Sequence, residues 1–261
     1  RRQRQMCIRD RDNLLSAGTE NTQITWMDVK IDNHAITPRN GKTVELNALW
    51  YNALKIMARL AEKYENKQLC RKYLEMAEKT KKSFDEKFYN EEKHCLYDVL
   101  GDSKVRPNQL FALSLSHPIV DNAEIAEQVL NTVENKLLNK YGLKTLSSDE
   151  DGYVDVYEGS AYRRDSSYHQ GITWPWLLGL YYDALKNTMI IEKNRTKRQE
   201  LEEKITKLVY TTKETFKAEM FERSSIGTIS EIYDSTEPYE ERGAFAQAWS
   251  VAEVLRIIAK K

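Results

Sequence analysis

The sequence predicts a helical protein, and three observations support this prediction. Glycine and proline number 10 and 5 among 261 residues, fewer than the tight turns of an all-β fold usually require. From residue 44 onward, apolar residues recur at the i, i+3, i+4, i+7 spacing of amphipathic helices. Hydrophobic residues make up 41% of the chain and charged residues 31%, which favours a packed core over general disorder. We therefore expect an all-α fold.

The first four of seven expected helices follow from apolar stripes and helix-start signals. They are expected at residues 44–64, 70–88, 108–115 and 123–138. The first two carry broad apolar stripes that are separated by a break at Asn66. Pro107 precedes the third and suits the first turn of a helix. In the fourth, Ile125, Val129 and Val133 recur at every fourth position, the period of one helix face.

The last three expected helices differ in the apolar pattern that predicts them. Residues 172–185 are apolar on every side, which is typical of a buried inner helix. Residues 201–216 combine a narrow apolar stripe with a heavily charged outer face. A final helix is expected at 244–258. Its expected buried residues are Phe245, Ala248, Trp249, Ala252 and Leu255.

The charge balance and the cysteines exclude several classes of protein. Lysine and arginine number 40, as do aspartate and glutamate, so the chain lacks the net basic charge of a general nucleic-acid or membrane-surface binder. No apolar run approaches the ~18 residues of a membrane span. Cys7, Cys70 and Cys95 are odd in number and lack the CxxC spacing of a zinc site. With no apolar signal-peptide core at the N-terminus, we expect a cytoplasmic protein without nucleic-acid or membrane partners.

The chain is expected to divide at residue 12. Residues 1–12 hold five arginines without an apolar period, and we interpret them as a non-native or disordered basic arm. Residues 13–261 form the folded part. Within it, three long irregular segments at about 13–43, 140–170 and 220–242 mix aromatic, acidic and amide residues. Loops this long in a compact domain usually serve function.

These irregular segments have the composition of a carbohydrate site. Sugar hydroxyls pair with carboxylates and amides, while sugar C–H faces stack on tryptophan and tyrosine. Glycoside hydrolysis requires two carboxylates in different environments. Asp28, between Met27 and Val29, has an apolar setting that suits an acid, and Glu231 has a polar loop setting that suits a base. Either carboxylate alone is more often a helix cap or an ion-pair partner.

Seven strings, in order along the chain, resemble the C-terminal amylo-α-1,6-glucosidase domain of bacterial and archaeal glycogen debranching enzymes. The strings are TWMD (25–28), TPRNGKTVELNALW (37–50), RPNQ (106–109), YHQG (168–171), WPW (174–176), SEIYD (230–234) and QAWSVAE (247–253). The resemblance implies a glucoamylase-like (α/α)6 barrel of six helical hairpins. About seven of its twelve helices are expected in this chain, so we expect a partial catalytic domain, truncated before Asp28, whose partner is the missing N-terminal part.

The resemblance also implies a reaction and the residues that perform it. The reaction is inverting hydrolysis of α-1,6-linked glucose at branch points of glycogen or limit dextrin, without metal or cofactor. Asp28 matches the general acid and Glu231 the general base. The matching strings, together with the residues shortly before YHQG, place further residues at the glucose pocket or in support of it: Trp26, Arg39, Glu45, Asn108, Arg164, Asp165, His169, Gln170, Trp174 and Trp249. For Glu45, at a helix start, capping is the alternative role.

Two other functions stay open at this stage. One is another (α/α)6 glycosidase, such as a relative of glucoamylase or trehalase, which would differ in linkage preference. The other is a helical carbohydrate-binding protein without turnover. For the chain by itself we expect little or no activity, because an incomplete helical ring leaves apolar faces exposed.

Overall fold

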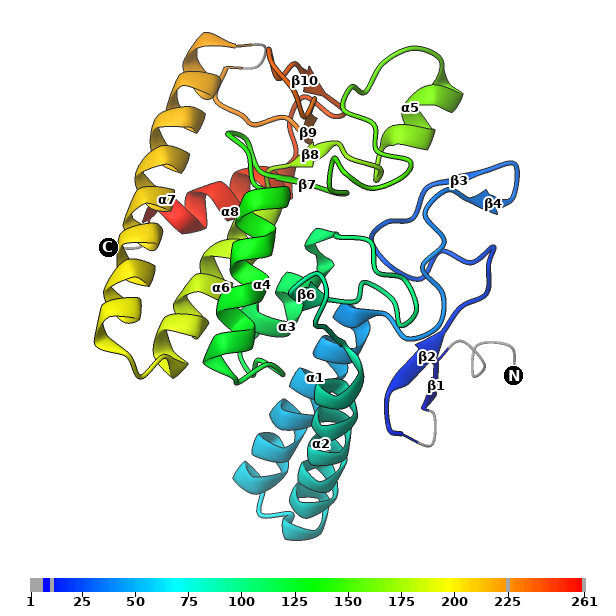
Figure 1. Cartoon of the computed structure of the whole chain (residues 1–261), viewed down its shortest axis with the longest axis vertical. Coiled ribbons are helices and arrows are strands. Elements are labelled where there is room, and N and C mark those ends of the chain that lie inside the picture. The colour runs from blue at the N-terminus through cyan, green and yellow to red at the C-terminus, as the bar shows by residue number, and fades with distance from the viewer. Residues whose placement is uncertain (1–6, 10–11, 224–225, 260–261) are drawn as a thin grey trace. The chain divides into compact units, whose positions relative to one another are not determined.

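The computed structural model describes residues 7–9, 12–223 and 226–259 (Figure 1). Within these residues, eight α-helices alternate with ten strands of only two or three residues each. The helix-rich character expected from the sequence is confirmed. The described residues contain no helix that is both long and apolar enough to cross a membrane. The expected basic arm lies largely outside the described residues, although Cys7–Arg9 form strand β1.

The chain forms two compact units and passes from one to the other more than once. The first unit runs to residue 103 and takes in 108–129, and the second takes in 104–107 and the chain from residue 130 onward. Helix α4 (Ala123–Lys136) therefore contributes to both.

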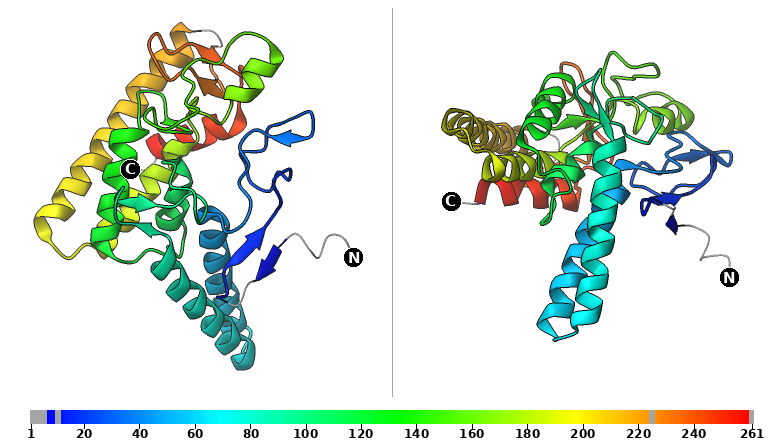
Figure 2. Two further views of the ribbon diagram at one scale, coloured as in Figure 1. Left: turned by 45° about the vertical axis from the view of Figure 1, so that its right-hand side comes forward. Right: turned by 60° about the horizontal axis from the view of Figure 1, so that its bottom comes forward.

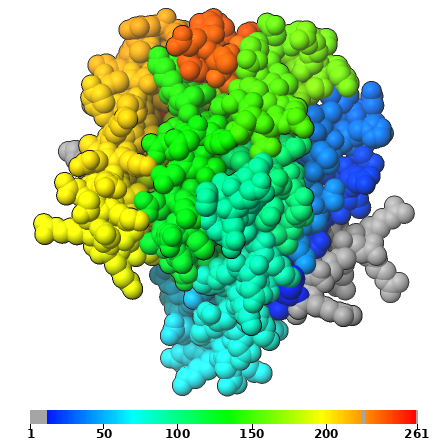
Figure 3. All heavy atoms as spheres, in the orientation of Figure 1, coloured from blue at the N-terminus to red at the C-terminus, as the bar shows by residue number. Residues whose placement is uncertain are grey.

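The first unit is built around a helical hairpin of α1 (Val44–Lys63) and α2 (Lys67–Lys87), which lie side by side in both views of Figure 2. The hairpin turns at Asn66, whose side-chain Oδ1 accepts a hydrogen bond from the Leu69 N–H at 3.0 Å and so caps α2. Its buried seam includes Leu54, Ala77 and Phe84. The break predicted at Asn66 is therefore a helix start. The outer face of α2 lies at the surface (Figure 3, cyan to turquoise).

Three short antiparallel strand pairs and a short helix complete the first unit. The pairs are β1 with β2 (Leu15–Ala17), β3 (Lys30–Ile31) with β4 (His34–Ala35), and β5 (Tyr89–Asn90) with β6 (Cys95–Leu96). The helix expected at 108–115 begins at Pro107, as predicted, but its first turn, Pro107–Leu110, is a 3-10 helix and only Phe111–Ser114 (α3) is α-helical.

The second unit packs α7 (Arg195–Glu222) and α8 (Ala248–Ala259) against α6 (Leu177–Ile191). Helix α6 buries residues on most of its surface, as expected of an inner helix. It begins later than the expected residue 172, because Pro175 disfavours helical backbone at Trp174, which instead lies in strand β8 (Thr173–Trp174). The short helix α5 (Ala161–Ser167) was not expected.

The buried face expected for the last helix was wrong. Phe245 and Leu255 are 70% and 57% exposed, and Trp249 is 37% exposed, whereas Ser250, Val254 and Ile257 form the buried face. The helix begins at Ala248 instead of 244 because the preceding residues bond to the loop before β9: Gln247 N–H donates to the Ile229 carbonyl at 3.0 Å. The loop therefore sets both the start of α8 and the face that it buries.

Four strands from distant parts of the chain form one sheet in the second unit. The order is β10-β9-β8-β7, and all neighbours are antiparallel. The strands are β7 (Leu143–Lys144), β8, β9 (Ile232–Tyr233) and β10 (Glu241–Arg242). This sheet gathers the irregular segments that carry the second half of the candidate site residues.

Candidate active site

Asp28, the expected acid, lies in the loop between β2 and β3 of the first unit, and its side chain is exposed. This differs from the apolar setting expected from its sequence neighbours. The residues before it are firmly held: Met27 is 2% exposed, and the indole Nε1–H of Trp26 donates to Asn108 Oδ1 at 2.7 Å. The Asp28 backbone carbonyl accepts a bond from the Gln23 side chain. The loop is thus anchored up to Asp28, whose carboxylate stays open to solvent.

A buried polar network lies beneath this loop. Arg39 donates from Nε and Nη2 to the two Asp98 carboxylate oxygens at 2.6 and 2.9 Å. Its Nη1 and Nη2 also bond to Glu45, the latter at 2.6 Å. Asn108 Nδ2 donates to Asp98 Oδ1 at 2.8 Å, while its own Oδ1 receives the Trp26 indole. The bonds form a continuous chain from Glu45 to Trp26.

The charges in this network compensate one another through Arg39. Burial opposes the charge of Arg39, but the neighbouring carboxylates of Asp98 and Glu45 outweigh burial and raise the pKa of its guanidinium. Arg39 and Glu45 are each 3% exposed, and Asn108 is fully buried. Arg39, Glu45 and Asn108, which were expected at the glucose pocket, are therefore buried residues that support the Asp28 loop. Glu45 pairs with Arg39 in the first turn of α1, where Thr43 is the N-cap residue.

Glu231, the expected base, precedes β9 in the second unit and is half-buried. Its Oε2 accepts a bond from the Ala244 N–H, and its Oε1 accepts one from Gln247 Nε2, both at 3.0 Å. Its own N–H donates to the Ala244 carbonyl at 2.9 Å. Gly243, at φ +69°, passes so close that a Cβ there would overlap Glu231 Oε2. The carboxylate is therefore fixed by the chain that leads into α8.

His169 and Gln170 lie together through Arg106. The Arg106 guanidinium donates to the His169 carbonyl and to Gln170 Oε1, both at 2.7 Å, and to the Thr145 carbonyl at 3.1 Å. The His169 ring is buried and stacks on Trp174, with ring centroids 5.4 Å apart. Arg106 was part of a matching string but was not expected at the site.

Aromatic rings continue from His169 to the surface of the unit. Trp174 is buried and meets Trp249 edge-on at 5.7 Å, and Trp249 stacks on Trp176 at 5.0 Å. Trp249 lies in the first turn of α8, two residues after Gln247, whose side chain bonds to Glu231. Its partial exposure leaves an aromatic ring at the surface of this unit.

Arg164 and Asp165 are exposed on α5, and Arg164 Nη1 donates to the Gly159 carbonyl at 2.7 Å. Tyr157 lies near both Asp165 and Glu231: burial, followed by the negative charge of Asp165 and with a contribution from Glu231, raises the pKa of its hydroxyl. Tyr157 was not expected at the site. Its backbone N–H donates to the buried Asp234 at 2.7 Å, which holds it in place.

Asp28, Trp26, Arg39, Glu45 and Asn108 thus lie in the first unit, and the other expected site residues lie in the second. Each unit brings its own candidate carboxylate together with residues from the matching strings. Among the described residues, no group of three histidine, cysteine, aspartate or glutamate side chains is placed to hold a metal ion.

Comparison with known proteins shows the family. The family model described as "Amylo-alpha-1,6-glucosidase" matches residues 3–256. The glycogen debranching enzyme of Saccharomyces cerevisiae is 24% identical, over 66% of this chain and 14% of the yeast protein. The chain therefore spans a small part of that relative's length.

Solved structures share the fold at low sequence identity. A protein titled sialidase has a TM-score of 0.66 at 12% identity, over 95% of this chain and 22% of its own. The GH63 mannosylglycerate hydrolase of Thermus thermophilus has a TM-score of 0.54 at 12% identity, over 84% of this chain and 45% of its own. An uncharacterized conserved protein from the same organism scores 0.56 at 14% identity, over 84% and 47%. The family match supports a glycosidase, and these neighbours show that the fold is shared.

Proposed function

This chain belongs to the amylo-alpha-1,6-glucosidase family, and from that premise we propose that it hydrolyses the α-1,6-linked glucose at branch points of glycogen or limit dextrin. We propose that its helices belong to an (α/α)6 barrel, and that a branched α-glucan is the substrate. Asp28 acts as the general acid and Glu231 as the general base. Because the match covers only 14% of the yeast relative, we assign only the hydrolytic step to this chain.

The observation that carries this proposal is the way in which the second unit holds Glu231. Each carboxylate oxygen accepts one hydrogen bond from the loop at 3.0 Å. An ionised carboxylate has about four acceptor positions, so both oxygens retain acceptor capacity for a water molecule. A fixed, half-buried carboxylate with this capacity suits a general base, which must orient a water before it attacks.

The chemistry then follows the inverting course. Asp28 gives its proton to the glycosidic oxygen as the bond from that oxygen to the anomeric carbon breaks, and the main glucan chain leaves with a free 6-hydroxyl. Water, losing a proton to Glu231, attacks the anomeric carbon from the opposite face, so β-glucose is released. The carboxyl groups must then lie ~6.5–9.5 Å apart to admit that water. The solvent-exposed position of Asp28 suits a group that recovers its proton after each turnover.

The remaining site residues divide by their burial. Trp249, whose ring is partly exposed, stacks on the glucose. The exposed side chains of Arg164 and Asp165 bond to the hydroxyls of the glucose. The buried rings of His169 and Trp174 back this face. Trp26, which is bonded to Asn108, keeps the Asp28 loop in position.

Release of glucose from limit dextrin tests the proposal. The protein that contains this chain is incubated with dextrin trimmed by phosphorylase and transferase, and proton NMR follows which anomer of glucose appears first. We expect β-glucose. Asp28→Asn and Glu231→Gln should each reduce the rate by about 10²–10⁴-fold, while Asp151→Asn and Glu200→Gln, on exposed residues of the second unit, leave it unchanged.

A second substrate separates the two roles. α-Glucosyl fluoride has a leaving group that needs no protonation, so Asp28→Asn should hydrolyse it at close to the unmodified rate, whereas Glu231→Gln should not. Release of α-glucose, or full activity in both variants, would overturn the proposed mechanism. Binding of dextrin without glucose release would instead indicate a carbohydrate-binding protein.

A further inference from the structure

We propose that a hollow between α2 and the start of α4 in the first unit is an accessory site that binds one glucosyl residue of an α-glucan chain. This inference rests on the proposed function for its choice of sugar. The candidate catalytic residues do not line the hollow, so it would hold the polymer without cleaving it.

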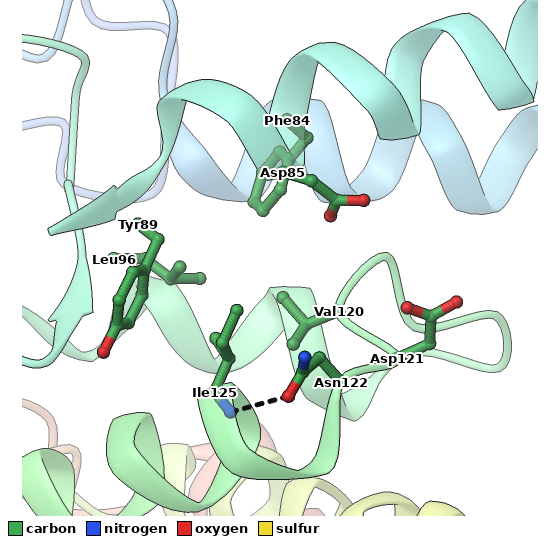
Figure 4. Close-up of a pocket in the computed structure, with 8 residues that line it drawn as sticks. All are labelled: Phe84, Asp85, Tyr89, Leu96, Val120, Asp121, Asn122 and Ile125. Carbon is green, nitrogen blue, oxygen red and sulfur yellow. Dashed lines mark hydrogen bonds between the residues drawn. The ribbon is translucent and has the colours of Figure 1, made fainter. Parts of the chain in front are cut away.

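The hollow has the size and the lining for a single sugar ring (Figure 4). Its volume is about 230 Å³, below the ~300–1,000 Å³ typical of pockets for larger ligands. Phe84, Leu96 and Val120 form its apolar floor and are at most 6% exposed. Floors of this kind bury the C–H face of a sugar, and aromatic rings do so with favourable geometry.

Tyr89 gives the hollow a fixed aromatic wall. Its hydroxyl donates to Gln128 Oε1 on α4, and Figure 4 shows this hydroxyl directed away from the hollow, so that the ring itself borders the space. Because the ring is already held in place, binding a sugar against it costs little additional side-chain entropy.

The rim carries polar groups that are ordered before any ligand arrives. Lys81 Nζ bridges Asp85 Oδ2 and Asp121 Oδ1, each at 2.9 Å, and also donates to the Ile119 carbonyl at 3.0 Å. Both carboxylates are about half or more exposed, so their other lone pairs face solvent and accept bonds from hydroxyls.

Asn122 adds a donor to this rim. Its Oδ1 accepts bonds from the N–H groups of Glu124 and Ile125 at 2.9 and 3.1 Å, which leaves its amide nitrogen on the side of the hollow (Figure 4). With two carboxylates and one ammonium, the rim carries a small negative charge. A neutral polyol with donors and acceptors fits this rim, whereas an anion is repelled.

Binding of maltotriose and of glycogen, in an Asp28→Asn background that prevents turnover, tests the inference. Maltotriose binding is followed by titration calorimetry, and glycogen binding by retardation in a native gel that contains glycogen. Asp121→Ala removes an exposed rim acceptor, Tyr89→Ala removes the wall, and Val120→Trp fills the hollow. Each should weaken binding about tenfold, the equivalent of ~1.4 kcal/mol. Tyr64→Ala, on a tyrosine that is 75% exposed in the same unit, is the matched control.

Circular dichroism establishes that each variant is folded, and Asp121→Ala, on the surface, decides the matter if the core variants are unstable. Affinities within twofold of the control in Asp121→Ala and Tyr89→Ala would overturn the inference. The two proposals fail separately. If Val120→Trp abolishes glycogen binding while the unmodified protein releases no glucose, the accessory site stands and the hydrolase proposal fails. If glucose is released and binding is unaffected, only the accessory site fails.

Discussion

Replacing Asp98 by asparagine tests whether the network beneath Asp28 supports that loop. The Asp98 carboxylate accepts three side-chain hydrogen bonds, two from Arg39 and one from Asn108, at 2.6 to 2.9 Å. An asparagine of nearly the same shape has one acceptor oxygen and turns an NH₂ group toward a donor. About two charge-assisted bonds are then lost, each contributing ~1.5–3 kcal/mol.

Glu45 remains paired with Arg39 in the variant, which limits the loss. We therefore expect Asp98→Asn to lower the free energy of unfolding of the first unit by about 3 kcal/mol, the lower end for a broken buried ion pair. Urea unfolding, followed at the indole N–H signal of Trp26 by NMR, reports on this unit. That signal should also shift in the folded variant, because Asn108 loses its partner and its bond to Trp26 changes.

Glu62→Gln, an exposed carboxylate of the same unit, is the control and should change stability by less than ~0.5 kcal/mol. A loss below about 1 kcal/mol in Asp98→Asn, or an unchanged Trp26 signal, would refute the reasoning that the network holds the loop.

Three further substitutions have expected outcomes. Gly243→Ala places a methyl group against Glu231 Oε2, at a position where φ is positive. We expect the free energy of unfolding to fall by about 1–3 kcal/mol and glucose release to slow, with KM little changed. An unchanged kcat would contradict this. Burial raises the pKa of the Glu219 carboxyl above its ordinary value of 4.5. The protonated carboxyl therefore stabilises the folded protein at low pH, and this stabilisation is lost as the pH rises above 4.5. The melting temperature of Glu219→Gln, relative to that of the unmodified protein, should therefore rise between pH 4.5 and pH 7. A difference between the two melting temperatures that does not change with pH would rule this out. Burial acts to raise the pKa of Asp12, but bonds such as that from Lys42 hold it at about 2, so Asp12→Asn should destabilise above pH 3.8 and cease to matter near pH 2.

Helix positions were predictable because their signals are local. Asn66 marks a break and Pro107 a helix start in the sequence. In the structure, Asn66 caps α2, which begins at the next residue, and a 3-10 turn begins at Pro107. The buried face of the last helix was not predictable, because Phe245 and Leu255 fit an apolar stripe as well as Val254 and Ile257 do. Tertiary packing decides between such faces, and two-residue strands leave no period to detect.

The candidate site, too, has residues that the sequence predicted and residues that it did not. The matching strings contained Asp28 and Glu231 because the resemblance extends over consecutive residues. Asp98 gave no signal: its partner Arg39 lies 59 residues earlier, and a lone aspartate after an apolar pair resembles any surface turn. Likewise, the roles of Arg39 and Glu45 as buried supports depend on three-dimensional pairing that spacing alone does not reveal.

The four-stranded sheet of the second unit has a consequence for the order of folding. Its strands are minimal, and Tyr233 pairs across the sheet with Thr173, which lies some sixty residues earlier. Closing a loop of that length costs chain entropy before the contact returns any stability. We therefore expect the segment that carries Glu231 to join the sheet after the helices have formed. During synthesis, the candidate base can reach its place only after Ala244 and Gln247, which bond to its carboxylate, have left the ribosome.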